Sequence, residues 1–190
     1  MGHKVLVVTS SARKNGNSVI LANAFIRGAE EAGHEVRVFD AAKASMDGCH
    51  GDASCHKTGA CGLKDDGVKL HELLQWADTL LLASPLYFGG FNAQMKKVID
   101  RFYPYAAPKG REKLAVKTVY LIATGASREL ASFKPMEAIF DHALSVLKLE
   151  EGGKLFAMGL KAPGEAANYD SWMRKAVRMG MNIGAYTNDI

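Results

Sequence analysis

Three cysteines, Cys49, Cys55 and Cys61, lie together in one segment and have a clear capacity for chemistry. Thiolates bind zinc and iron, and His50 or His56 offers an imidazole that would complete a zinc site. Five residues separate successive cysteines, however, and this spacing matches no common structural zinc site. An odd number of thiols also argues against a disulfide framework. The spacing alone leaves two alternatives open. One is a zinc site, and the other is a metal-free segment whose thiols are redox-reactive where they are exposed near positive charge.

A second group of polar side chains lies in the stretch TSSARKNGNS, residues 9–18, which follows an apolar run and precedes a helical pattern. Because a helix N-terminus offers unpaired backbone N–H groups, an anion can bind there, and Ser18 is a good helix cap. The loop lacks the glycine pattern of a nucleoside triphosphate or dinucleotide site, so it favours a phosphate monoester. An ordinary capped turn is the alternative. The side chains that would donate to the phosphate are Ser10, Ser11, Arg13, Asn17 and Ser18.

A third stretch, SPLYFGG at residues 84–90, combines aromatic side chains with proline and glycine. A flat polycyclic ligand needs an apolar or aromatic wall and backbone donors at its ring edge, and this stretch supplies both. Thr124 and Gly125 form a small-residue loop suited to the other edge of such a ligand. The alternative is a loop whose Tyr87 and Phe88 pack into the core.

Regular elements between these groups must position them. Apolar runs predict five strands, at Lys4–Thr9, Glu35–Phe39, Thr79–Ala83, Lys117–Ala123 and Lys154–Met158. Stretches of helical period predict helices at Ser18–Ala32, Asp66–Trp76, Asn92–Tyr103, Pro135–Leu147 and Tyr169–Met181. This alternation predicts an α/β fold with a doubly wound five-stranded parallel sheet and helices on both faces.

The expected organisation is a single domain over residues 1–190, with a long insertion loop at about 41–65 that holds the cysteines. In a doubly wound sheet of order 2-1-3-4-5, ligands bind beyond the carboxyl ends of the strands. The candidate phosphate and ring contacts lie in the loops that follow the first, third and fourth strands. These loops begin at the carboxyl ends of the strands. The sequence therefore predicts one ligand site built from three loops.

The composition excludes several classes of protein. Hydrophobic residues make up 48% of the chain and charged residues 23%, as in folded globular proteins and unlike disordered ones. A net charge of +4 over 190 residues is too weak to predict nucleic-acid binding. No apolar run reaches the roughly 20 residues of a membrane span, and the N-terminus lacks a signal-peptide pattern. We therefore expect a cytoplasmic protein without nucleic-acid or membrane partners.

Two motifs carry a resemblance to a known family. The loop SSARKNGNS resembles the GSPRKNGNT-type phosphate loop of the NAD(P)H-dependent FMN reductase family and the related iron–sulfur flavoproteins, both flavodoxin-like. The stretch SPLYFGGFNAQMKKVIDR is similar to the family pattern SPVYFGSMSAQMKAFIDR. The resemblance implies FMN phosphate contacts at Ser11, Arg13, Asn17 and Ser18, with Ser10 in place of the family's glycine. It implies contacts to the isoalloxazine ring at Pro85, Leu86, Tyr87, Phe88, Gly89, Thr124 and Gly125.

The cysteine segment departs from the pattern it resembles. Iron–sulfur flavoproteins carry C-x2-C-x2-C-x5-C followed by two aspartates; here Cys49, Cys55 and Cys61 match three ligand positions, and Asp52 stands at the second cysteine. A [4Fe–4S] cluster takes four thiolates. We therefore predict no cluster and no bound metal, and a site built from Cys49, Asp52, Cys55 and Cys61 is the less favoured alternative.

The resemblance implies an FMN-dependent oxidoreductase that moves electrons from NADH or NADPH through FMN to a quinone, flavin, nitro compound or metal acceptor. The chemistry would be the cofactor's, so no catalytic side chain is predicted. A homodimer or homotetramer is also implied. Two alternatives remain: a non-enzymatic electron carrier of the iron–sulfur flavoprotein or flavodoxin type, and a phosphate-ligand binding module without redox function. A pI near 8.9 argues against a flavodoxin-like carrier, since flavodoxins tend to be acidic.

Overall fold

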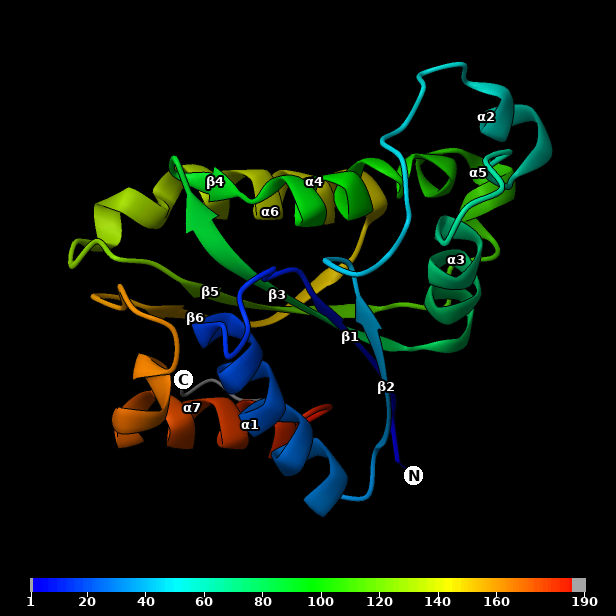
Figure 1. The fold of residues 1–190 in the computed structure, drawn as a ribbon. Helices are drawn as coiled ribbons and strands as arrows, with labels where there is room; N and C mark the ends of the chain where they lie inside the picture. The colour runs from blue at the N-terminus through cyan, green and yellow to red at the C-terminus, as the bar shows by residue number, and fades with distance from the viewer. Residues whose placement is uncertain (1, 186–190) are drawn as a thin grey trace.

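A computed structural model of the chain describes residues 2–185, and a twisted sheet lies at its centre (Figure 1). The strands are β1 (Lys4–Thr9), β2 (Glu35–Asp40), β3 (Thr79–Tyr87), β4 (Gly90–Phe91), β5 (Thr118–Thr124) and β6 (Glu150–Ala157). The five parallel strands have the order β2-β1-β3-β5-β6, which confirms the predicted doubly wound order. The predicted domain also includes residues 1 and 186–190, which lie outside the described residues.

Helices cover both faces of the sheet, as predicted (Figure 1). One face carries α1 (Asn17–Glu31) and α7 (Asp170–Met181), and the other carries α3 (Gly67–Trp76), α4 (Ala93–Asp100) and α6 (Lys134–Leu147). The sequence did not predict the short helices α2 (Ser54–Thr58) and α5 (Pro108–Arg111), or the 3-10 turns η1 (Tyr103–Ala106), η2 (Leu130–Phe133) and η3 (Glu165–Asn168). No helix within residues 2–185 has the length and apolar character needed to cross a membrane.

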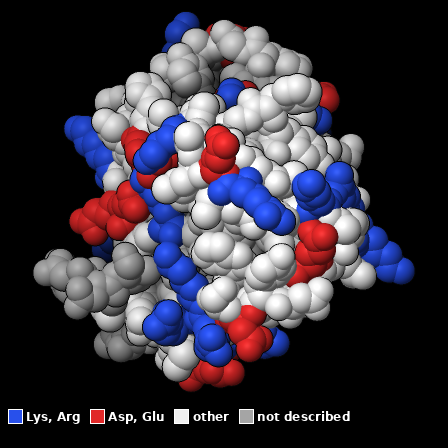
Figure 2. All heavy atoms as spheres, turned by 90° about the vertical axis from the view of Figure 1, so that its left-hand side faces the viewer, with Lys and Arg blue, Asp and Glu red and all other residues white. Residues whose placement is uncertain are grey.

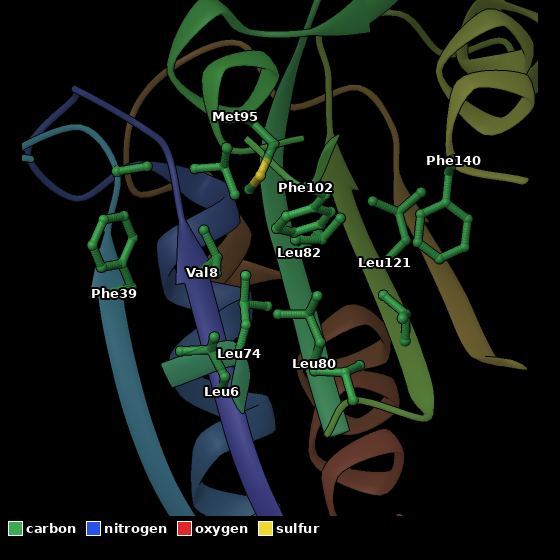
Figure 3. Close-up of a cluster of buried hydrophobic side chains, with 14 of the residues drawn as sticks. Leu6, Val8, Phe39, Leu74, Leu80, Leu82, Met95, Phe102, Leu121 and Phe140 are labelled. Carbon is green, nitrogen blue, oxygen red and sulfur yellow. The ribbon is translucent and has the colours of Figure 1, made fainter. Parts of the chain in front are cut away.

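The sheet separates two apolar layers because alternate residues of each strand point to opposite faces. On one face Leu6, Leu80 and Phe140 belong to a cluster beneath α3, α4 and α6 (Figure 3). On the other face Val5 and Leu81 pack under α1 and α7. Strands buried on both faces read as continuous apolar runs, and for this reason β1, β3 and β5 are predictable from sequence.

Two strands differ from the prediction by more than one residue at an end. β3 continues to Tyr87, and its end pairs with β4, a sixth, short antiparallel strand. β6 begins at Glu150 rather than Lys154. Its first residues are polar or glycine, so they carry no apolar signal. Gly152 is needed there because a Cβ would overlap the Tyr120 ring on the neighbouring strand.

A buried arginine holds the insertion between β2 and α3 against the rest of the molecule. Arg101, which follows α4, has a fully buried side chain that donates to the two Asp65 carboxylate oxygens at 2.8 and 3.0 Å. It also donates to the Asp47 carbonyl at 3.1 Å. The hydrogen bond from Arg101 lowers the pKa of Asp65 to about 2. A Cβ at Gly67 would overlap the guanidinium, so this position must remain glycine.

Candidate functional site

A cavity of about 120 Å³ opens at the carboxyl ends of β1, β3 and β5, where this type of fold binds ligands. Figure 2 views this side of the molecule, on which Lys and Arg side chains, interspersed with Asp and Glu, lie around an area of uncharged residues. The predicted residues that the structure brings together in the lining are Ser11, Arg13, Asn17, Ser18, Pro85, Leu86, Tyr87, Thr124 and Gly125. Loops far apart in sequence therefore converge on one cavity.

Ser18 lies in the first turn of α1, which begins at Asn17 with Gly16 as its N-cap, so Ser18 is not the helix cap that the sequence predicted. Ser18 lines the cavity, and its fully buried hydroxyl finds no hydrogen-bond partner within residues 2–185. The Ser11 hydroxyl accepts a hydrogen bond from the Arg13 backbone N–H at 3.3 Å, so its own proton remains available. Two hydroxyl donors and a helix N-terminus therefore face the same space, and this arrangement fits the oxygens of a phosphate.

Part of the lining comes from the loop after β6, which the sequence analysis missed. Arg13 Nη1 donates to the Lys161 carbonyl at 3.1 Å, and Asn17 Nδ2 donates to the Ala162 carbonyl at 2.9 Å. The Asn17 Oδ1 atom accepts from the Ala166 N–H at 3.0 Å. Both ends of the Asn17 amide therefore bind this loop, and Asn17 positions the wall of the cavity. The additional lining residues are Gly16, Ala126, Leu160, Lys161 and Pro163.

Three predicted contact residues lie outside the lining. Ser10 is buried, and its hydroxyl donates to the Ala83 carbonyl at 3.3 Å, so it points into the sheet. Phe88 and Gly89 form the turn between β3 and β4, with positive φ angles of 49° and 77°. Phe88 is fully exposed there. Motif similarity placed these residues in loops whose neighbouring residues line the cavity, but it does not indicate which way each side chain points.

Asn92, another residue that the sequence analysis missed, fastens the loops together beneath the cavity. Its Nδ2 donates to the Ser10 carbonyl at 2.7 Å, and its Oδ1 accepts from the Ser84 hydroxyl at 3.2 Å. The same oxygen accepts from the Met95 N–H at 3.2 Å and so caps α4. The available signal was an asparagine as the first residue of the predicted helix, a residue type that favours the N-cap position, and the helix in fact begins one residue later, at Ala93. Asn92 therefore joins the ends of β1 and β3 to the start of α4.

Replacing Asn92 with alanine is expected to lower the free energy of unfolding by about 1.5 kcal/mol, because it removes a helix cap and a buried cross-link. Asn92→Ser keeps an oxygen that can cap α4 but is too short to reach Ser10, so it should lose less. Thermal denaturation of the three proteins measures both effects. An unchanged melting temperature for Asn92→Ala would show that this cross-link does not stabilise the loops.

A larger cavity, of about 570 Å³, lies between η1 and α6. Its lining is mainly apolar, with Phe102, Val146 and Leu147 among its residues, and it includes no lysine or arginine. It also lies away from the carboxyl ends of the strands. It is the larger cavity, but its lining within residues 2–185 holds Asp100 and no lysine or arginine, so it is less suited to a phosphate.

The cysteine segment does not fit a four-thiolate cluster. Cys49, Cys55 and Cys61 line a small separate cavity with Asp52, but no three His, Cys, Asp or Glu side chains in the described part of the chain are placed to hold one metal ion. The Asp52 carboxylate accepts a hydrogen bond from the Ser54 N–H at 2.9 Å, which fixes it in the turn before α2. Three thiols and a carboxylate engaged elsewhere do not make the ligand set of a [4Fe–4S] cluster.

Several known proteins resemble this chain over most of its length. An iron–sulfur flavoprotein of Archaeoglobus fulgidus is 29% identical over 181 residues, which cover 95% of this chain and 78% of that protein. One of Methanocaldococcus jannaschii is 28% identical over 186 residues and 95% of each chain. The solved structure of an NAD(P)H:quinone oxidoreductase from Methanothermobacter marburgensis matches over 100% of both chains, with a TM-score of 0.80 and 19% identity. At that identity the likeness shows the fold alone.

The family model for NADPH-dependent FMN reductases matches residues 3–136. This range holds the β1–α1 loop, the end of β3 and the loop after β5, and thus most of the cavity lining. The match confirms the resemblance carried by the two sequence motifs. This chain belongs to the NADPH-dependent FMN reductase family.

Proposed function

We propose that the chain binds FMN at the cavity beside Ser18 and transfers electrons from NADH or NADPH through it to a small-molecule acceptor. One observation carries the choice of site: the Ser18 hydroxyl is buried at a helix N-terminus and has no hydrogen-bond partner in residues 2–185. Leaving a buried donor unpaired costs about 1–3 kcal/mol. A phosphate oxygen from the cofactor would satisfy it.

The phosphate end of FMN would lie against the β1–α1 loop. Ser11 and Ser18 donate hydroxyl hydrogen bonds to it, and the first turn of α1 adds backbone N–H groups and a positive dipole. Arg13 is exposed, and the donors of its guanidinium that do not bind the Lys161 carbonyl can pair with the phosphate charge. Asn17 acts indirectly, because it holds the loop after β6 in place.

The ring end would lie outside the enclosed space. A cavity of about 120 Å³ is smaller than the roughly 300–1,000 Å³ of sites that enclose a drug-sized ligand, so it takes one end of the cofactor. Pro85, Leu86 and Tyr87 would form a wall for the ring. Phe88 and Gly89, at the exposed tip beside Tyr87, are proposed contacts of its edge.

Bound FMN supplies the hydride-accepting chemistry. The residues of this chain hold the phosphate, orient the ring and exclude water from one of its faces. Among residues 2–185 the cavity lining contains no His, Asp, Glu or Cys side chain, and its titratable side chains are Arg13, Tyr87 and Lys161. The proposed role of the protein is therefore to place the cofactor, and no general base is assigned to it.

Quinones are the first acceptors to test, because the fold is shared with an NAD(P)H:quinone oxidoreductase. A free flavin, a nitro compound and a metal complex are the others. Electron carriage without turnover is the second candidate, since the two curated relatives described above are named iron–sulfur flavoproteins. We also propose that residues 1–190 form one FMN-binding domain with the insertion at 41–65, and that the chain assembles as a homodimer or homotetramer.

Anaerobically purified protein is expected to be yellow, and heat should release a flavin that co-migrates with FMN rather than FAD. NADH and NADPH oxidation is then followed with a soluble quinone as acceptor. Turnover with either donor supports the reductase. Bound FMN without turnover would favour the electron carrier, and failure to bind FMN after reconstitution would overturn both.

A further inference from the structure

Exposed apolar side chains lie at both ends of one layer of the molecule. In Figure 1, α4 and α6 lie above the sheet, with β4 near one end of this layer and α5, which follows η1, at the other. Large hydrophobic side chains exposed in these segments are Phe88, Tyr103, Ile139 and Val146. Exposed apolar surface that gathers in one region marks an interaction site. The proposed FMN chemistry does not account for the part of this surface that lies on α6.

The turn between β3 and β4 presents an aromatic side chain to solvent. Phe88 is fully exposed there, with a φ of 49°, a left-handed conformation that bulky residues rarely adopt. A turn with two left-handed residues between antiparallel strands favours asparagine followed by glycine. Neither burial nor the conformation of the turn therefore accounts for phenylalanine at this position. Aromatic side chains are enriched in the contact surfaces between proteins, and Phe88 projects as such a contact would.

A groove at the other end of the layer can receive an aromatic ring. It is the cavity of about 570 Å³ between η1 and α6, and its lining includes Phe102, Tyr103 and Val146. Tyr103 and Val146 are about half exposed, so the groove is open to solvent. Among residues 2–185, no lysine or arginine lines it and Asp100 is its one acidic residue. The groove therefore suits an uncharged, apolar side chain.

Helix α6 connects the projecting turn to the groove. A Cβ on Gly89 would lie 3.4 Å from Pro135 Cγ, so the turn packs against the first turn of α6. The last turns of the same helix, with Ala143 and Val146, line the groove. At the helical rise of about 1.5 Å per residue, Pro135 and Val146 lie about 16 Å apart along the axis. Ile139, Ala143 and Val146 are four and three residues apart, so they share one face of the helix, separate from the buried face.

We propose that Phe88, the Ile139–Ala143–Val146 face of α6 and the groove form the surface on which two copies of this chain pair. A projection and a groove on one surface fit each other in a second copy when a two-fold axis crosses the middle of α6. The two α6 helices then run antiparallel, with their dipoles opposed, which is electrostatically favourable. Phe88 of each copy, beside the N-terminal end of its own α6, reaches the groove at the C-terminal end of the other α6.

The two-fold arrangement is favoured because it uses both features of each copy at once. A head-to-tail arrangement would leave one free Phe88 and one free groove, and it would continue into a longer assembly. A small apolar ligand in the groove would leave Phe88 exposed. The inference rests on the proposed assembly into a homodimer or homotetramer, in which this surface is one interface, and it does not depend on FMN binding.

Light scattering coupled to size-exclusion chromatography of the full-length protein tests the surface. The unmodified protein should be a dimer or tetramer, and Phe88→Asn should halve the measured mass. Asparagine suits the left-handed turn, so this variant should keep its fold, which far-UV circular dichroism checks. Val146→Lys places a charge in the groove and should have the same effect. Val68→Lys, on α3, is the matched control: Val68 and Val146 are 47% and 49% exposed, and this variant should keep the full mass.

A photo-crosslinker locates the contact directly. With p-benzoylphenylalanine at position 88, irradiation should give a covalent dimer in which position 88 is joined to residues 99–106 or 142–147 of the other chain. A monomeric unmodified protein would overturn this surface together with the proposed assembly. An oligomer that Phe88→Asn and Val146→Lys leave intact, or a cross-link to any other segment or protein, would overturn the surface alone. FMN content is measured separately, so failure of the proposed flavin function is distinguishable from each of these results.

Discussion

Replacing Asp65 with asparagine is expected to lower the free energy of unfolding at pH 7 by about 3 kcal/mol, because it leaves a buried guanidinium without its carboxylate. Arg101 has a fully buried side chain, and Asp65 accepts two of its hydrogen bonds, at 2.8 and 3.0 Å. For a chain of this size the melting temperature should fall by about 6–12 °C. Urea and thermal denaturation measure the two quantities.

The matched control is the neighbouring ion pair on α4. Lys96 and Asp100 are 2.6 Å apart, but their side chains are 48% and 42% exposed. Exposed pairs contribute about 0–1 kcal/mol, so Asp100→Asn should be nearly neutral. Equal losses in the two variants would contradict the assignment of stability to the buried pair.

The Asp65 pair also predicts a pH dependence. Its hydrogen bond from Arg101 lowers the carboxyl pKa to about 2 in the folded chain, against about 3.9 in an unfolded one. A lowered pKa gives stabilisation that is fully present above the unfolded value and is lost as the pH falls through the folded one. The difference in the free energy of unfolding between the unmodified protein and the Asp65→Asn variant should therefore be constant above about pH 5 and shrink toward pH 2. A difference that peaks near neutral pH would indicate another titrating group.

Replacing Arg13 with alanine is expected to weaken FMN binding by about 2 kcal/mol, or roughly 30-fold in Kd, because a charge-assisted hydrogen bond to the phosphate is lost. Arg13 is the cationic side chain that the β1–α1 loop contributes to the cavity lining. The original protein should also lose affinity at high salt more steeply than the variant. Fluorescence titration of FMN against deflavinated protein measures both effects.

Lys14→Ala is the matched control for Arg13→Ala, since Lys14 is adjacent and exposed but does not line the cavity. It should leave the affinity nearly unchanged. Arg13 also donates to the Lys161 carbonyl, so the melting temperature of each apoprotein must be compared. Unchanged FMN affinity in a stable Arg13→Ala protein would place the phosphate elsewhere.

The positions of β1, β3 and β5 were predictable because these strands are buried on both faces and read as uninterrupted apolar runs. Their order followed from the alternation of strands and helices, which is typical of doubly wound folds. Only the second half of β6 was predicted. Its first half, which includes Glu150 and Gly152, belongs to a strand at the edge of the sheet, where an apolar pattern is not needed. The short helix α2 carries no periodic pattern. Contacts between segments far apart in sequence, such as the hydrogen bond from Lys109 to the Lys57 carbonyl, hold it, and these form only once the chain is folded.

The candidate site was predicted in part, for a related reason. The loop motifs identify the segments of the chain that line the cavity, and Ser11, Arg13 and Ser18 are among the lining residues. They do not indicate side-chain direction, so Ser10 was assigned to the ligand although its hydroxyl binds the Ala83 carbonyl. Lys161 belongs to no motif. It reaches the cavity only because β6 pairs with β5, and that pairing is a tertiary contact rather than a local one.

The hydrogen bond from the Ala166 N–H to the Asn17 side chain has a consequence for biosynthesis. The two residues are 149 positions apart, at nearly opposite ends of the chain. During vectorial synthesis the phosphate loop emerges early, but its wall arrives only after the last strand has joined the sheet. Contacts of such long range form late in folding. A ribosome-bound chain, or one truncated before Ala166, therefore lacks part of the proposed FMN site, and under the proposed function FMN uptake would report that the chain has been made and folded beyond that residue.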